Sequence, residues 1–139
     1  MGLITIEKTI GNFDYLHPDK TEIAYSFIGL PDDIETKSIY FSDEYQYDLE
    51  VKIDEQYSSL DFARDLKRLI DDAYFFSTSM SYIEKVIKYL EENEEEQRFL
   101  LIEKLLEDYI LEKKKILRRI NGINNRIKEL EGIREKLKK

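Results

Sequence analysis

Hydrophobic residues make up 42% of the 139-residue chain and charged residues 37%, which fits one compact domain or a small domain with an appendage and excludes a disordered chain. The absence of cysteine excludes disulfide scaffolds, thiol catalysis and cysteine-bound metal sites, and a single histidine, His17, excludes two-histidine metal sites. No apolar run approaches the roughly 18 residues of a membrane span. We therefore expect a soluble protein of the cytoplasm, or of the host cytoplasm if the protein is viral, with no membrane association.

The net charge changes sign along the chain. Residues 1–110 contain 26 acidic and 11 basic residues, a net charge of −15, whereas residues 111–139 contain 4 acidic and 11 basic residues, a net charge of +7. Such asymmetry is informative about partners and solubility. The sequence indicates an acidic body followed by a basic C-terminal segment.

The first strand-like segment is residues 3–10, in which apolar and polar side chains alternate. This alternation places Ile4, Ile6 and Ile10 on one face, which we expect to be the covered face of a sheet. A Gly-Asn pair, which is a two-residue hairpin signal, follows the segment. We therefore expect residues 13–16 to return along this first strand.

Three further segments alternate in the same way before residue 55. Residues 22–30 and 38–41 each predict a strand, and the clearest alternation of the chain lies in residues 47–53. In that last segment Asp48 and Glu50 lie on the polar face, opposite four apolar side chains. Together these patterns predict an antiparallel sheet of four or five strands, with one covered face and one wet, acidic face.

Helical signals replace the strand pattern after residue 57. Ser58 with Asp61 three residues later forms a capping box, and Ser81 with Glu84 forms a second one, so we expect a helix to begin at each. Asn93 offers a third start and favours a helix break at that point. The apolar residues at helical spacing after the first cap are Phe62, Leu66, Leu69, Ile70 and Ala73.

The strongest signal is a heptad pattern in residues 99–137. With residue 99 at position a, ten of the twelve a and d positions are apolar, and the exceptions are Lys113 and Arg134. The Asn and Gly residues within positions 121–125 are good turn formers, so a helical hairpin at this point is the alternative to one continuous helix. Ile123 keeps the heptad phase across the segment, which favours the continuous helix.

This apolar stripe also predicts self-association. Soluble monomers rarely leave such a surface in water, so we expect a coiled-coil homodimer. Lys113 at an a position disfavours larger, fully buried assemblies. The residues that we expect to form the dimer seam are Ile116, Ile120, Ile123, Ile127, Leu130 and Leu137.

The patterns together predict an α+β fold in two parts. We expect residues 1–92 to form an acidic body, with the sheet in residues 1–55 and two helices in residues 58–92. We expect residues 93–139 to form a long basic C-terminal helix that mediates coiled-coil dimerisation.

Few side chains have the pattern of a catalytic or metal site. His17 lies in a turn beside Pro18, where neither a partner nor a shielded pocket can be inferred for a general base. The acidic clusters at residues 32–35 and 43–50 lack the ligand spacing of a calcium-binding loop. The five glycines are isolated, and no phosphate-binding motif is present. We therefore expect a protein that is not an enzyme and that binds no cofactor and no metal.

The acidic body indicates one class of function. Acidic side chains spread over a surface can imitate a nucleic-acid backbone and occupy a nucleic-acid-binding channel. In composition the chain resembles the small, cysteine-free acidic proteins with which phages inhibit restriction, CRISPR and repair enzymes. We therefore expect a non-catalytic interaction protein, a phage or mobile-element inhibitor that docks on a host protein complex through its acidic surface. The candidate partner-binding residues are Asp48, Glu50, Glu91, Glu92, Glu94, Glu95 and Glu96.

Two other functions stay open. The cations of residues 111–139 could grip phosphates, which would make the chain a nucleic-acid-binding or assembly accessory protein that uses its basic coiled coil. Against this, acidic residues are interleaved with those cations, and aromatic residues for base stacking are missing beyond Tyr109. The third possibility is a small enzyme or ligand-binding protein whose site forms across the dimer.

Overall fold

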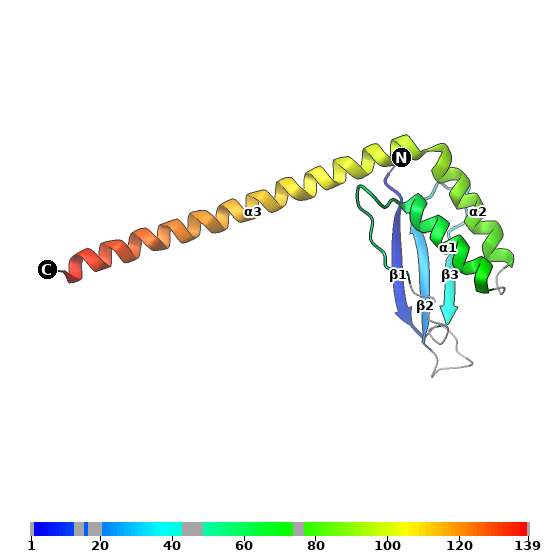
Figure 1. Cartoon of the computed structure of the whole chain (residues 1–139), viewed down its shortest axis with the longest axis horizontal. Coiled ribbons are helices and arrows are strands. Elements are labelled where there is room, and N and C mark those ends of the chain that lie inside the picture. Colours follow the sequence, from blue (N-terminus) through cyan, green and yellow to red (C-terminus); the bar gives the residue numbers. More distant parts are fainter. Residues whose placement is uncertain (1, 13–15, 17–20, 43–48, 74–76, 139) are drawn as a thin grey trace. The chain divides into compact units, whose positions relative to one another are not determined.

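The structure, a computed structural model, describes residues 2–12, 16, 21–42, 49–73 and 77–138. The chain divides into two compact units, Met1–Ile102 and Glu103–Lys139. Its elements are, in chain order, β1 (Thr5–Gly11), β2 (Glu22–Ile28), β3 (Ser38–Ser42), α1 (Ser59–Ala73), α2 (Ser77–Glu92) and α3 (Glu94–Leu137) (Figure 1). This arrangement confirms the predicted α+β class, with two helices before a long C-terminal helix.

The three strands form one antiparallel sheet in the order β1-β2-β3, so β2 lies in the middle. Ile6 lies opposite Phe27, and Tyr25 lies opposite Ile39. Residues opposite each other in an antiparallel pair share a face, and this face is the one that becomes the core. The described residues therefore contain three strands, where four or five were predicted.

The central strand follows its sequence pattern. Ile23, Tyr25 and Phe27 of β2 alternate with more polar residues, and all three are at most 2% exposed. The strand predicted at residues 38–41 is confirmed by β3, in which Ile39 is also buried. In these two strands the period of two in hydrophobicity gives the buried face directly.

The strand predicted around Leu49 is wrong for residues 49–53, which lie outside the sheet. The backbone of Leu49 bonds to side chains instead of a neighbouring strand. Its N–H donates to the Tyr25 hydroxyl at 2.7 Å, and its carbonyl accepts from that hydroxyl at 3.3 Å and from Lys8 Nζ at 3.5 Å. Leu49 and Val51 pack against the core. Their alternation therefore reflects an extended segment half-buried against the core, which has the same apolar pattern as a strand.

The first strand agrees with the sequence only in part. Ile4 is buried and Ile6 packs against the core, but Ile10, which was expected on the same covered face, is 62% exposed. In Figure 1, α1 runs from the start of β1 towards the end of β3, so the end of β1 lies away from this helix. Of the predicted return strand at residues 13–16 the structure describes only Leu16, which lies outside the strands and is 85% exposed.

The capping box predicted at the start of α1 is confirmed. The Ser58 N–H donates to Asp61 Oδ2 at 2.8 Å, and the Asp61 N–H donates to Ser58 Oγ at 3.3 Å. These bonds satisfy backbone donors that the first turn of a helix leaves without partners. The core-facing side chains of α1 that are at most 2% exposed are Phe62, Ala63, Leu66 and Ile70.

The second helix begins earlier than predicted. α2 starts at Ser77, four residues before the expected cap at Ser81. Ser79 is buried and Met80 packs against the core, so tertiary contact extends the helix towards its N-terminus. The capping box of Ser81 is therefore not the start of this helix.

The helix break predicted at Asn93 is confirmed, because α2 ends at Glu92 and α3 begins at Glu94. The Asn93 side-chain amide donates to the Tyr89 carbonyl at 2.9 Å, which satisfies an acceptor at the end of α2. The Gln97 N–H donates to the Asn93 carbonyl at 3.0 Å and so begins the hydrogen-bond ladder of α3.

The core lies between the sheet and the first two helices. Phe62 of α1 contacts Tyr25 and Phe27 of β2 edge to face, with ring centroids 5.4 and 6.3 Å apart. Phe41 of β3 contacts Tyr25 in the same manner at 6.1 Å. Such pairs stabilise beyond the area that they bury. α2 completes the core with its buried residues Tyr82, Ile83, Val86 and Leu90.

The second unit is helix alone. α3 runs without interruption through residues 121–125, so the helical-hairpin alternative is wrong and the continuous helix is confirmed. At about 1.5 Å per residue, the part of α3 in this unit extends about 52 Å. Asn and Gly have low helix propensity, so local propensity stabilises this part of α3 only weakly. Helices in proteins are stabilised mainly by packing of their apolar face, and the apolar pattern of α3 is therefore its most informative feature.

Candidate functional site

An apolar stripe on α3 is the first candidate site. The a and d positions from Ile102 to Leu137 that carry apolar side chains are 43–81% exposed. The six predicted dimerisation residues, Ile116, Ile120, Ile123, Ile127, Leu130 and Leu137, all lie on this stripe. Leu101 is the buried residue of α3, and it belongs to the first unit.

The cations of the second unit are distributed around the same helix. Lys113 and Arg134 lie within the stripe at a positions, and Arg126 forms an ion pair with Glu129 at 2.9 Å. The heptad positions furthest from the stripe also carry cations. Those at b, c and f among the described residues are Lys104, Lys114, Lys115, Arg118, Lys128 and Lys136, and all six are exposed.

The predicted acidic surface is only partly assembled by the structure. Asp48 lies outside the described residues, and Glu50 is exposed on the segment between β3 and α1. The other five candidates lie on either side of Asn93, where Glu91 and Glu92 end α2 and three glutamates open α3. Glu91 forms an ion pair with Arg64 at 3.4 Å, and within the described part of the chain the other four form none. The three at the start of α3 are Glu94, Glu95 and Glu96, which also interact favourably with the helix dipole.

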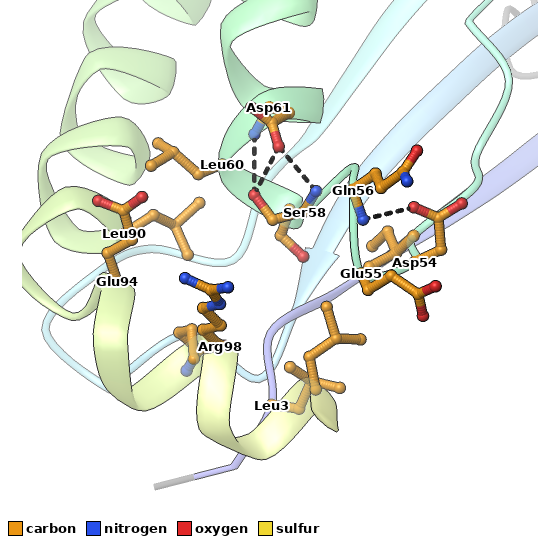
Figure 2. A pocket seen from close by; sticks show the side chains of 14 residues that line it. Leu3, Asp54, Glu55, Gln56, Ser58, Leu60, Asp61, Leu90, Glu94 and Arg98 are labelled. Atoms are coloured by element: carbon orange, nitrogen blue, oxygen red, sulfur yellow. Dashed lines mark hydrogen bonds between the residues drawn. The ribbon is translucent and has the colours of Figure 1, made fainter. Parts of the chain in front are cut away.

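A pocket in the first unit brings together residues that the sequence did not single out (Figure 2). Its volume is about 300 Å³, and its apolar lining comes from leucine and isoleucine side chains of five segments. In Figure 2, Arg98 and Glu94 extend from α3 on one side, and Asp54 and Glu55 lie across from them. The lining residues are Leu3, Ile53, Asp54, Glu55, Gln56, Ser58, Ser59, Leu60, Asp61, Leu90, Glu94, Gln97, Arg98 and Leu101.

Hydrogen bonds hold the N-terminal segment at this pocket. The Ile4 N–H donates to Gln97 Oε1 at 2.8 Å, and Gln97 Nε2 donates to the Gly2 carbonyl at 3.1 Å. The Ser59 hydroxyl donates to the Ile4 carbonyl at 2.6 Å. The side-chain amide of Gln97 therefore accepts from one backbone N–H and donates to one backbone carbonyl, as the backbone of a neighbouring strand would. These two bonds join the start of α3 to the residues just before β1. No local sequence pattern identifies such a contact between residues more than 90 positions apart.

Tyr57 and Asp65 form a polar pair beside the core. The Tyr57 hydroxyl donates to Asp65 Oδ2 at 2.5 Å. Burial raises the pKa of Tyr57 well above its ordinary value, and the hydrogen bond to the Asp65 carboxylate raises this pKa further. Both causes favour the neutral phenol, so the pair serves as a structural bond rather than as a proton donor near neutral pH.

The polar lining of the pocket is mostly acidic. Its lining contains four carboxylates and one guanidinium but no histidine, lysine or cysteine. The Ser58 hydroxyl donates to Asp61 Oδ2 at 2.9 Å and is engaged in the helix cap. Across the residues that the structure describes, no group of acidic or histidine side chains could hold a metal ion. In that same part of the chain, no helix is long and apolar enough to cross a membrane.

Comparison of the chain with protein-family models, with the sequences of characterised proteins and with solved structures finds no match.

Proposed function

We propose that this chain is a non-catalytic protein–protein interaction protein of the cytoplasm, which forms a homodimer through α3. The observation that carries the proposal is the exposed heptad stripe, whose apolar a and d side chains from Ile102 to Leu137 are 43–81% exposed. Soluble monomers do not usually expose an apolar surface of this length. A second copy of the same helix supplies a matching stripe.

The energetics of burial support dimerisation. Full burial of a large aliphatic side chain stabilises by about 1.5–3 kcal/mol, so burial of the half that is exposed here contributes about 1 kcal/mol per residue. Nine such residues on each of two helices contribute on the order of 20 kcal/mol. Association costs roughly 4–15 kcal/mol in lost freedom of the two chains. The stripe is therefore long enough to hold a dimer.

Aspartate in the seam tests this assignment. Ile120→Asp with Ile127→Asp places two charges in the stripe, and we expect sedimentation to show a monomer with the body still folded. The matched control places two aspartates seven residues apart on the outward face, Arg118→Asp with Asn125→Asp, and it should remain dimeric. An unchanged oligomer in the seam variant would show that the stripe does not mediate self-association.

The external partner that we propose is a host protein complex with a basic surface, such as the nucleic-acid channel of a restriction, CRISPR or repair enzyme. The first unit carries 23 acidic and 10 basic residues, a net charge of −13. Glu50 and Glu92 are exposed and form no ion pair with any residue that the structure describes. Contacts between these carboxylates and a basic partner would be assisted by charge and weakened by salt.

A pull-down from a host lysate at low and high salt tests the partner class. We expect a nucleic-acid enzyme to be captured at low salt and its activity to fall when the purified chain is added. Glu50→Lys with Glu92→Lys should weaken both effects without changing the circular dichroism spectrum. Full inhibition by this charge-reversed chain would mean that the acidic surface does not make the contact.

Nucleic-acid binding through the basic segment is a second candidate function. It is favoured by the five exposed cations that residues 111–138 place on the outward face of α3, which stay accessible when the stripe is covered. Binding of double-stranded DNA by the full chain should then fall steeply with salt. It should also fall when Lys114, Lys115 and Arg118 are replaced by glutamate. Affinity that is the same for the variant would exclude this function.

A further inference from the structure

The charges of α3 are divided between its two halves. Residues 94–112 carry seven acidic and two basic residues, a net charge of −5, whereas residues 113–139 carry three acidic and eleven basic residues, a net charge of +8. Paired helices lie about 8–10 Å apart, a distance over which charges still interact at physiological salt. A parallel pair sets each half beside the same half of the second copy. An antiparallel pair sets the acidic start of one helix beside the basic end of the other.

The two cations within the stripe favour the same orientation. Lys113 and Arg134 both occupy a positions. In a parallel pair in register, each a residue faces the same residue of the second copy, so both cations would meet their own copies in the seam, where like charges repel most strongly. In an antiparallel pair, a positions face d positions. With residue 99 opposite residue 137, Lys113 faces Ile123 of the second copy, and Arg134 faces its Ile102.

The charges directly beside the stripe contribute only weakly in either orientation. A parallel pair gains attraction between Arg98 and Glu103 and between Arg126 and Glu131. The antiparallel pair gains attraction between Glu112 and Arg126 but sets Glu103 near Glu131. The antiparallel pair also sets Arg119 opposite its own copy, but exposed charge pairs of this kind contribute little in either arrangement. The orientation therefore depends on the opposite net charges of the two halves of α3 and on the two cations within the stripe, Lys113 and Arg134.

We propose that α3 pairs with a second copy of itself in antiparallel orientation, in the register that sets Phe99 of one copy beside Leu137 of the other. This register covers the whole stripe, because these residues are its first and last members. The inference rests on the proposed self-association and adds its geometry. It also gives the three glutamates at the start of α3 a role, since they lie near the lysines that end the second copy.

Disulfide trapping tests the orientation directly, because the chain contains no cysteine and an introduced thiol has no competitor. Phe99→Cys and Leu137→Cys are made as single variants, one with an affinity tag, then unfolded and refolded together and mildly oxidised. We expect the cross-linked species to contain one copy of each variant, and neither variant alone to cross-link efficiently. Arg118→Cys, on the outward face, is the control and should not cross-link. A parallel pair would instead cross-link each single variant to itself, and that result, or the absence of the mixed cross-link, overturns the inference.

Charge reversal gives a second test. Replacing Glu94, Glu95 and Glu96 by lysine should raise the dimer dissociation constant about tenfold at low salt, because the basic end of the second copy loses its counter-charge. In a parallel pair these glutamates face one another, so reversal would leave the constant unchanged, which would contradict the inference. Sedimentation of the unaltered chain separates the two proposals. A monomer overturns both, whereas a dimer without the mixed cross-link overturns only the orientation.

Discussion

Replacement of Leu66 by alanine measures how much the packing of the core contributes to the free energy of unfolding of the body. Leu66 lies in the middle of α1 with 0% of its surface exposed, and Phe62 and Ile70, one turn away on either side, are also buried. Aromatic rings on both strand and helix leave the surroundings little freedom to collapse into a cavity. We therefore expect a loss in the upper half of the usual range of about 2–5 kcal/mol.

This loss is large relative to the stability of a small domain. A body of about 100 residues is stable by roughly 5–15 kcal/mol, and each 1 kcal/mol shifts its melting temperature by about 4–8 °C. Leu66→Ala should therefore lower the melting temperature by about 15–40 °C. Urea unfolding of the full chain, followed by fluorescence of its ten tyrosines, gives the free energy directly because the chain contains no tryptophan.

The matched control removes the same three carbon atoms from an exposed site. Leu111 is 53% exposed on the outward face of α3, so Leu111→Ala should change the free energy of unfolding by less than about 0.5 kcal/mol. Both variants are compared at one protein concentration, because self-association makes the transition depend on concentration. Equal unfolding midpoints for the two variants would refute the packing of α1 described above.

Two further predictions concern polar contacts. The pKa of Tyr57 is raised in the folded chain, so its contribution to stability is fully present below the ordinary tyrosine value of about 10 and is lost as the pH rises towards the folded value. Tyr57→Phe should make the urea midpoint fall less steeply between pH 9 and 11 than in the unaltered chain, and an identical slope would contradict the assignment. Gln97→Ala removes the acceptor of the Ile4 N–H, so hydrogen exchange at Ile4 should accelerate and stability should fall by about 1–2 kcal/mol, whereas unchanged exchange would mean that the bond is not formed.

Local patterns in the sequence were sufficient for several elements. The capping box of Ser58 and Asp61 places the start of α1, because a helix end needs partners for its free N–H groups and these two residues supply them within one turn. The break at Asn93 and the continuity of α3 were also predicted, the latter because Ile123 keeps the heptad phase where a turn would not require it. The α+β class and the buried face of β2 follow from periodicity in the same way.

Contacts between distant residues decided the rest. Residues 49–53 have the alternation of a strand, yet the Tyr25 hydroxyl binds both backbone groups of Leu49, and that bond joins positions 24 residues apart. The early start of α2 depends on burial of Ser79 against a core that local capping signals do not describe.

Of the two candidate sites, one was predicted from the sequence and the other depends on the tertiary structure. The apolar stripe of α3 was predicted from sequence, because a heptad repeat is a property of one helix and needs no other element to define it. The pocket was not, because its lining comes from Leu3 ahead of β1, from the segment before α1, and from three helices. In the sequence, Arg98 cannot be distinguished from the other cations of a highly charged helix. It becomes part of a site only where the fold sets Asp54 and Glu55 across from it, since the proximity of such residues is fixed by packing and not by spacing along the chain.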